Sequence, residues 1–276
     1  MSGVPSTLDE GRRGPARWLL AVYSGLFLIY TLVPIAVMIT FSFNQAPNGR
    51  VSLRWIGFTL DSYRHAFAIA DLTTALIHSL VVAVVAMIAS VVIATPLALA
   101  LARYRFRGKS ATDVVIFADI AAPAVVVGAS LLSLFLTLNL PRGLFTIFIA
   151  HIAFDIAFAV VVIRARVATL DPALDRAAAD LGATPWVAFW TVTFPLILPG
   201  IIGAGMLAFA LSIDDLIITS FVAGQTLTFP LWVYGAVKTG IPPQVFVLST
   251  LIFLGGALIA VLNSVLAHRA GRRAAA

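Results

Sequence analysis

The chain has 276 residues, of which 61% are hydrophobic and only 11% are charged. This is more apolar surface than one soluble core of that length needs, so the composition predicts a membrane protein. The net charge of +6 arises from short basic clusters between apolar runs, which argues against a nucleic-acid-binding face. The sequence has no cysteine, which excludes disulfides, cysteine-ligated zinc and a thiol nucleophile.

Six apolar runs are long enough to cross a membrane, because a hydrocarbon core of about 30 Å is spanned by roughly 20 helical residues. The runs lie at about 18–43, 72–102, 114–138, 142–165, 196–219 and 243–267. The first run is longer than the apolar core of a secretory signal, which has about 7–15 residues, so we expect a retained helix. The predicted fold class is therefore all-α, a polytopic membrane protein with six transmembrane helices.

The basic side chains predict the orientation, because cytoplasmic loops retain lysine and arginine. With the N-terminus inside, 13 of the 18 Lys and Arg residues fall on the cytoplasmic side. These 13 are Arg12, Arg13, Arg17, Arg103, Arg105, Arg107, Lys109, Arg164, Arg166, Arg176, Arg269, Arg272 and Arg273. The outer side holds Arg50, Arg54, Arg64, Arg142 and Lys238. We therefore predict that both termini are cytoplasmic.

The segment between the first two runs, residues 44–71, mixes aromatic and polar side chains. Its aromatic residues include Trp55, Phe58, Tyr63 and Phe67. Such side chains favour the headgroup region, which predicts a short helix on the outer surface, and an ordered loop with ordinary aromatic packing is the alternative. Asp71 is predicted to be the N-cap of the second spanning helix.

One segment before the fifth run interrupts the apolar pattern on the predicted cytoplasmic side. Asp171 suits an N-cap, and Pro172 suits the first position of a helix. Gly182 suits a left-handed turn that ends this helix. Thr184 followed by Pro185 repeats the start signal. These signals predict a helix–turn–helix that lies along the inner face.

Two further features of this segment bear on its role. Pro195 and Pro199 are expected to break the chain before the fifth span. Alanines at positions 177–179 and 183 supply small side chains that permit close approach, which suits docking into a groove of a partner protein. The alternative is a hairpin that merely connects two spans.

Residues 176–183, which read R-A-A-A-D-L-G-A, resemble the EAA loop of ABC importer permeases, as do the later Phe194-Pro195 and Pro199-Gly200. In that family the loop forms the coupling helix that inserts into the ATPase subunit. The resemblance assigns ATPase coupling to Asp175, Arg176, Ala177, Ala178, Gly182 and Ala183. Arg176 stands where the family has glutamate, and the resemblance implies that Asp175 beside it makes the salt bridge to the ATPase instead.

Further motifs resemble the second permease of spermidine/putrescine importers. They are His78-Ser79-Leu80, residues 104–109, residues 151–154, residues 211–215, Ser220-Phe221-Val222 and residues 237–240. The resemblance implies a type I importer fold, with a single transmembrane permease domain over residues 1–276. Within it, residues 1–17 would form a cytoplasmic tail, 72–267 the core permease region and 166–195 the coupling segment.

The same resemblance implies the partners and the cargo. The partners would be a second permease in a heterodimer, two ATP-binding subunits and an extracytoplasmic solute-binding protein. The complex would lie in the lipid bilayer of the bacterial inner membrane, and it would not bind nucleic acid. The chain would be no enzyme and would need no cofactor, because it lacks a glycine-rich phosphate loop and a partner would use the ATP. The implied cargo is a polyamine. Pro123-Ala124 departs from the Pro-Asp of polyamine permeases, so thiamine, ferric iron and aminophosphonates are alternatives.

Four ionisable residues inside the predicted spans are candidates for the substrate path or gate, because charge at bilayer depth is costly unless it faces a cavity or a partner. They are His151, Asp155, Asp214 and Asp215. His151 and Asp155 share one helix face, so they form either a hydrogen-bonded pair between helices or a site where Asp155 meets a cationic substrate. Asp214 and Asp215 form either a cation gate or caps that pair with arginine or backbone groups.

Two other protein classes are alternatives at this point. A secondary transporter that works without ATP would show inverted repeats and broken spans; no repeat is evident, although Pro123 and Pro199 are positions where spans could break. A membrane enzyme would need a nucleophile or metal motif, and Ser, His and Asp are scattered without one. The sequence therefore favours a transport subunit.

Overall fold

The computed structural model describes residues 15–52, 54–171 and 173–274, and its regular elements are all helices. In chain order they are α1 (Pro15–Ser42), α2 (Asp61–Arg64), α3 (Ala70–Arg103), α4 (Lys109–Ala121), α5 (Ala124–Thr137), α6 (Leu144–Ala168), α7 (Ala173–Asp180), α8 (Pro185–Ala188), the π-helix η2 (Phe189–Thr193), α9 (Phe194–Ile213), α10 (Ile217–Val222), α11 (Phe229–Thr239) and α12 (Pro243–Ala274). The predicted all-α fold is confirmed. Most of the predicted tail, with Arg12 and Arg13, lies outside the described residues, as does Pro172.

Five helices of the described part are long and apolar enough to cross a membrane, and the bent pair of α4 and α5 makes a sixth if it forms one span. The chain divides into two compact units. The first contains residues up to 66 together with 240–265, and so includes α1, α2 and most of α12. The second contains residues 67–239 and the remainder of α12, and so includes every helix from α3 to α11.

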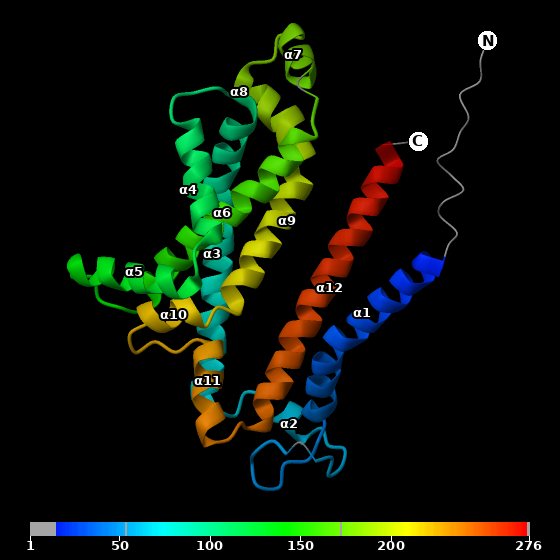
Figure 1. Cartoon of the computed structure of the whole chain (residues 1–276), viewed down its shortest axis with the longest axis vertical. Coiled ribbons are helices and arrows are strands. Elements are labelled where there is room, and N and C mark those ends of the chain that lie inside the picture. Colours follow the sequence, from blue (N-terminus) through cyan, green and yellow to red (C-terminus); the bar gives the residue numbers. More distant parts are fainter. Residues whose placement is uncertain (1–14, 53, 172, 275–276) are drawn as a thin grey trace. The chain divides into compact units, whose positions relative to one another are not determined.

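Three long helices, α3, α6 and α9, pack against one another in the second unit (Figure 1). Alanines that are fully buried line their contacts, among them Ala94 and Ala98 on α3, Ala159 on α6 and Ala204 on α9. Small side chains let helix backbones approach closely, which matters in a bilayer because lipid tails are as apolar as leucine and no hydrophobic effect drives helices together.

A close approach between α6 and α9 occurs at Gly200. A Cβ atom built on Gly200 would lie 2.6 Å from the Cβ of Arg166, so a larger residue would collide with that side chain. Arg166 lies along α9 and donates from Nε to the carbonyl oxygen of Leu196 at 3.0 Å. α6 and α9 therefore pack closely at the Pro199-Gly200 pair.

A second buried cluster lies farther along the same unit. It joins α10 and α5 to α3 and α6 through Val82, Phe135, Ile147, Ile218 and Val222. Gly128 of α5 contributes to this packing, because a Cβ there would lie 2.7 Å from the Phe221 ring. The cluster therefore fixes the two shorter helices on the long ones.

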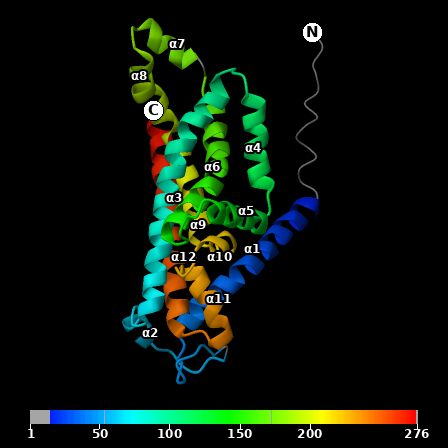
Figure 2. The same ribbon diagram turned by 90° about the vertical axis from the view of Figure 1, so that its left-hand side faces the viewer.

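The predicted span at 114–138 is bent rather than one straight helix, because Pro123 interrupts it. α4 ends at Ala121 and α5 begins at Ala124, with a bend of 109° between them (Figure 2). Ala122 is extended, with φ of −69° and ψ of 132°, as expected for a residue that precedes proline. Because of this break, α5 runs across α4 and does not continue in its direction.

The predicted break at Pro195 and Pro199 is also wrong. Helical backbone continues from Pro185 through η2 into α9, and both prolines lie within this continuous stretch. Each proline lacks an N–H for the helix, and the π-helix η2 directly before Pro195 is the kind of local adjustment that accommodates proline in a spanning helix. The fifth span is shorter than predicted at its other end, since α9 stops at Ile213 and α10 is separate.

The segment between α1 and α3 is a loop with one helical turn, α2, so the loop interpretation is closer than the surface helix. Asn44 organises it from a buried position. Its side-chain Oδ1 accepts the Ile56 N–H at 2.8 Å, and its Nδ2 donates to the carbonyl oxygen of Arg54 at 2.9 Å. The Phe43 ring stacks on Tyr63 with 4.8 Å between centroids.

The predicted N-cap of the second span is wrong by two residues. α3 begins at Ala70 with Ile69 as its N-cap, and Asp71 lies in the first turn. An acidic side chain is favourable there because the helix dipole places partial positive charge at that end.

Candidate functional site

The coupling segment has the predicted helix–turn–helix form. α7 ends at a left-handed Gly182 with φ of +82°, and the Thr184 hydroxyl caps α8 by accepting the Val187 N–H at 3.4 Å. Asp171 accepts the Ala173 N–H at 2.8 Å before α7 begins. Glycine suits this turn because most residues with a side chain rarely adopt a positive φ.

The residues assigned to ATPase coupling lie on two sides of this segment. Arg176 and Ala177 are exposed, whereas Ala178 is buried and Ala183 is half-buried. Leu181, next to the turn, is 89% exposed. An exposed apolar side chain at the turn provides a surface that a partner protein can bind.

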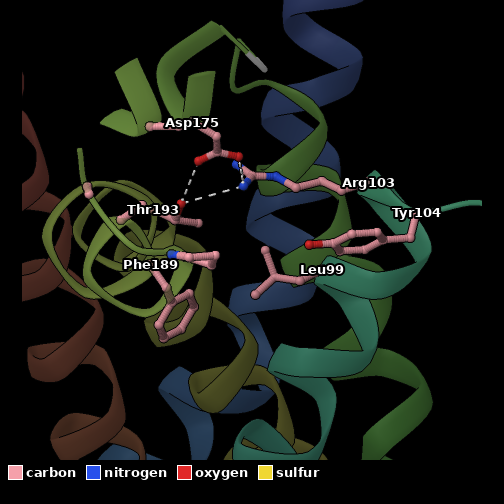
Figure 3. Close-up of a pocket in the computed structure, with 10 residues that line it drawn as sticks. Leu99, Arg103, Tyr104, Asp175, Phe189 and Thr193 are labelled. Carbon is pink, nitrogen blue, oxygen red and sulfur yellow. Dashed lines mark hydrogen bonds and ion pairs between the residues drawn. The ribbon is translucent and has the colours of Figure 1, made fainter. Parts of the chain in front are cut away.

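Asp175 has partners within the chain. Its carboxylate forms an ion pair with Arg103 at the end of α3 and accepts the Thr193 hydroxyl at 3.0 Å (Figure 3). Both carboxylate oxygens of Asp175 therefore have a partner inside the chain. These three residues, with Leu99, Tyr104 and the small residues of α7 and α8, line a pocket of about 290 Å³.

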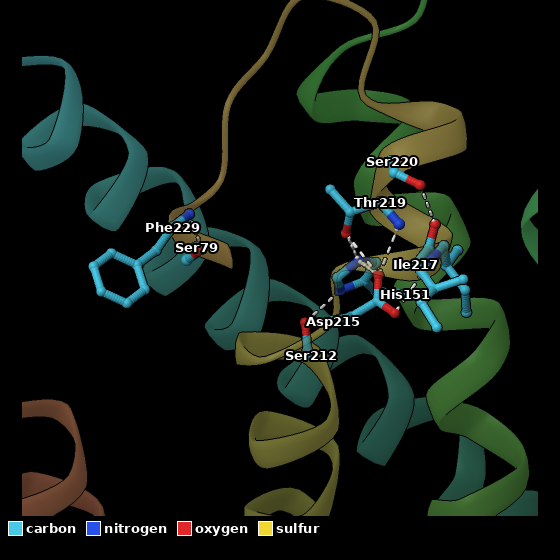
Figure 4. Close-up of polar contacts among 9 residues, drawn as sticks. Ser79, His151, Ser212, Asp215, Ile217, Thr219, Ser220 and Phe229 are labelled. Carbon is cyan, nitrogen blue, oxygen red and sulfur yellow. Dashed lines mark hydrogen bonds and ion pairs between the residues drawn. The ribbon is translucent and has the colours of Figure 1, made fainter. Parts of the chain in front are cut away.

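His151 forms its hydrogen bonds with residues far along the chain (Figure 4). Nδ1 lies 2.6 Å from the Ser212 hydroxyl, and Nε2 lies 2.8 Å from the Thr219 hydroxyl. Thr219 donates its own proton to Asp215 at 2.8 Å, so its oxygen accepts from Nε2 of His151. A neutral His151 then accepts the Ser212 proton at Nδ1.

The predicted hydrogen bond between His151 and Asp155 is therefore wrong. Asp155 is 1% exposed, and neither carboxylate oxygen has a hydrogen-bond partner among the described residues. The carboxylate nearest to His151 is Asp215, with 3.5 Å between Nε2 and Oδ2. The four-residue spacing places both side chains on one helix without bringing them into contact.

Asp215 is a helix cap, as one of the two interpretations proposed. It accepts the backbone N–H groups of Ile218 at 3.3 Å and Thr219 at 2.7 Å, which start α10. Asp214 is exposed at the end of α9. The two adjacent carboxylates thus differ: one is held by α10 and His151, and the other is accessible.

The loop between α10 and α11 is attached to α3 by the His78-Ser79 motif. His78 Nδ1 lies 2.9 Å from the Leu227 carbonyl oxygen. Ser79 accepts the Phe229 N–H at 2.8 Å (Figure 4). The two contacts join residues that are 149 and 150 positions apart in the sequence.

Comparison with known families decides the class of the protein. Residues 94–272 match the family of binding-protein-dependent transport system inner membrane components. The chain belongs to this family. It is a multi-pass permease of the inner membrane, a transport subunit rather than an enzyme, and the predicted resemblance to ABC importer permeases is confirmed.

Relatives of this permease cover most of its length. The spermidine/putrescine transport system permease protein PotC of Haemophilus influenzae is 32% identical over 247 residues, 88% of this chain and 95% of that protein. The putrescine transport system permease protein PotI of Escherichia coli is 34% identical over 248 residues, 87% of this chain and 86% of that protein.

Solved structures show the same permease fold at low sequence identity. A chain of a bacterial ABC transporter involved in the import of the acidic polysaccharide alginate aligns with a TM-score of 0.66 and 19% identity, covering 97% of this chain and 99% of that one. A chain of the MetNI methionine ABC transporter aligns with a TM-score of 0.60 and 15% identity, covering 75% of this chain and 97% of that one.

Sequence reasoning missed the partners that hold the permease's charged residues. Arg103 was interpreted only as a topology signal, although a basic residue in the last turn of a helix is also positioned to bind a neighbouring carboxylate. Ser212 and Thr219 flank the Asp214-Asp215 pair in the sequence. The position of these two hydroxyl residues near an acidic pair in the sequence indicates that they hydrogen-bond in the same network.

Proposed function

We propose that this permease moves a polyamine, spermidine or putrescine, across the inner membrane as part of an ATP-driven importer. The observation that carries the proposal is the 34% identity to a putrescine permease over 87% of the chain. Identity over nearly the whole chain includes the transmembrane helices that line a substrate path, so it bears on cargo as well as fold. Thiamine, ferric iron and aminophosphonates are the competing cargoes to test.

The proposed assembly contains a second permease, two ATP-binding subunits and an extracytoplasmic binding protein. A structural neighbour is an alginate ABC transporter in complex with a pentasaccharide-bound periplasmic protein, which supports this arrangement. In the proposed assembly the ATP-binding subunits hydrolyse ATP and dock on α7 and α8, and the permease needs no cofactor. The exposed Arg176 and Leu181 suit such a contact.

The proposed orientation has both termini in the cytoplasm. The distribution of 13 basic residues inside against 5 outside supports it. In this orientation the coupling segment faces the ATP-binding subunits, and the loop organised by Asn44 faces the binding protein. The single permease domain, with its core at 72–267, remains part of the proposal.

The proposed substrate path includes Asp155, Asp214 and Asp215, with His151 as the residue that holds Asp215 in place. Carboxylates attract the ammonium groups of a polyamine, and a charge inside the membrane is costly unless it has such a role. Asp214 is exposed in the present conformation, and Asp155 is buried within the chain. Asp155 would meet the cargo when the helices rearrange during transport.

Coupling to ATP is tested with a substitution at the turn after α7. Cells that carry the complete operon would be assayed for uptake of labelled putrescine and spermidine, with wild-type permease and with Gly182→Pro. Proline cannot adopt the φ of +82°, and it removes the N–H that Gly182 donates to Ala179 at 2.9 Å. We expect uptake to be lost while the permease stays in the membrane.

The matched control is Gly182→Asn, because asparagine tolerates a left-handed backbone and a Cβ there meets no atom within 4 Å. We expect this variant to keep most of the uptake. Uptake that is unaffected by Gly182→Pro would contradict coupling through this segment.

A further inference from the structure

Arg103, Asp175 and Thr193 close a ring of hydrogen bonds that joins three helical segments (Figure 3). Arg103 is the last residue of α3, Asp175 lies in the first turn of α7, and Thr193 ends η2, which leads into α9. Arg103 donates to Oδ2 of Asp175 and, at 3.5 Å, to the Thr193 hydroxyl, while Thr193 donates to Oδ1. The ring therefore connects the coupling segment to two membrane-spanning helices at one point.

Few other contacts hold α7 to the rest of the permease. Ala178 is its one buried residue among those described. In the described part of the chain, Asp175 makes the only side-chain hydrogen bonds between α7 and another helix. Between α7 and the end of α3 lies the pocket of about 290 Å³, with Ala179 on one side and Leu99 and Tyr104 on the other. A pocket replaces apolar packing there, so the ring is the direct connection.

The ring of hydrogen bonds is better placed to transmit movement between helices than to stabilise the fold. The Arg103 and Asp175 side chains are 23% and 35% exposed, and ion pairs of that kind contribute little to stability because water screens them. Thr193 is 3% exposed and belongs to a π-helix, a less regular element that is frequent at functional sites. Loss of the pair should therefore leave the fold intact.

We propose that Arg103 is a positioning residue that carries the displacement of α7 into α3 and, through Thr193, into α9. The inference rests on the proposed function, in which partner ATP-binding subunits move the coupling segment. With the ring closed, α7 and α3 move together. With the ring open, α7 moves with the ATP-binding subunits, but α3 and α9 do not move with α7.

The absence of cysteine makes a distance measurement straightforward. Spin labels at Ala173→Cys on α7 and Val92→Cys on α3, both exposed positions, would report the distance between the two helices in the complete complex. We expect the interval to stay constant when a non-hydrolysable ATP analogue binds. With Arg103→Gln we expect it to change, and we expect uptake per ATP hydrolysed to fall about tenfold, within the usual range of coupling between sites.

Two further variants make the test specific. Arg105→Gln removes the same charge two residues away at an exposed position, and we expect it to behave as wild type. Exchanging the pair, Arg103→Asp with Asp175→Arg, should restore the constant interval and much of the uptake per ATP. An exchange variant as uncoupled as Arg103→Gln alone would contradict the ion pair as the carrier.

The outcomes separate this inference from the function on which it rests. A constant interval and unchanged uptake per ATP in Arg103→Gln would overturn the inference and leave the importer assignment intact. Failure of the ATP-binding subunits encoded with the wild-type permease to copurify with it would overturn the proposed assembly and the inference together.

Discussion

The Nε2 atom of His151 lies 2.8 Å from the hydroxyl of Thr219 and so joins α6 to α10 inside the second unit. Both residues are buried, and the ring's other nitrogen binds Ser212. This links the centre of the permease to the turn that carries Asp214 and Asp215.

Replacing His151 by alanine should destabilise the permease. The change leaves the buried hydroxyls of Ser212 and Thr219 without this partner, which costs about 1–3 kcal/mol. We expect a lower melting temperature in detergent. His65→Ala is the control, because the His65 side chain is 60% exposed and binds only within its own turn. Equal melting temperatures for the two variants would contradict the buried network.

The close approach of α6 and α9 gives a second prediction. Gly200→Ala places a Cβ 2.6 Å from that of Arg166 and should cost about 1–3 kcal/mol through overpacking. Gly203→Ala, on the same helix, meets no atom within 4 Å and should be neutral or stabilising, because alanine favours helix. Thermal unfolding of both variants measures the difference. If Gly203→Ala were the more damaging, the packing described here would be wrong.

The loop that Asn44 organises provides a third prediction. Asn44→Ala removes two accepted and two donated hydrogen bonds that hold the loop, so the segment at residues 45–57 should open. We expect faster cleavage there by protease added outside spheroplasts. Asn48→Ala, at an exposed turn, is the control and should leave cleavage unchanged. Cleavage only after the cells are lysed would contradict the proposed orientation.

A substitution at Asp155 distinguishes a structural role of this residue from a role in transport. Asp155→Asn replaces a buried carboxyl group, which has no hydrogen-bond partner among the described residues, by an amide that cannot ionise, and an unpaired charge is costly to bury. We expect the melting temperature not to fall and polyamine uptake to decrease. Asp71→Asn, which changes an exposed carboxylate in the first turn of α3, should leave uptake unchanged. Unchanged uptake of every cationic cargo in Asp155→Asn would remove this residue from the substrate path.

The helices and the turn at Gly182 could be predicted from the sequence because local composition determines them. The break between α4 and α5 could not. Pro34, Pro96 and Pro199 all lie inside continuous helices, whereas Pro123 ends one, so proline alone does not decide. Tertiary packing around each residue makes the difference.

The site residues show the same limit. Spacing along α6 suggested a pair between His151 and Asp155, but the partners of His151 come from residues 61 and 68 positions away. Asp175 was likewise assigned to an outside partner because it lies next to Arg176 in sequence, while the fold turns it toward Arg103. Contacts between distant segments depend on helix packing, which one sequence does not reveal.

Uptake of labelled putrescine and spermidine is the most direct test of the central claim. Cells that lack their own polyamine importers would carry the complete operon, or the same operon without this permease, with labelled thiamine, ferric iron and an aminophosphonate measured in parallel. The account predicts saturable polyamine uptake that requires the permease and cellular ATP. Polyamine uptake that is absent from the complete operon, or that persists without this permease, would contradict it.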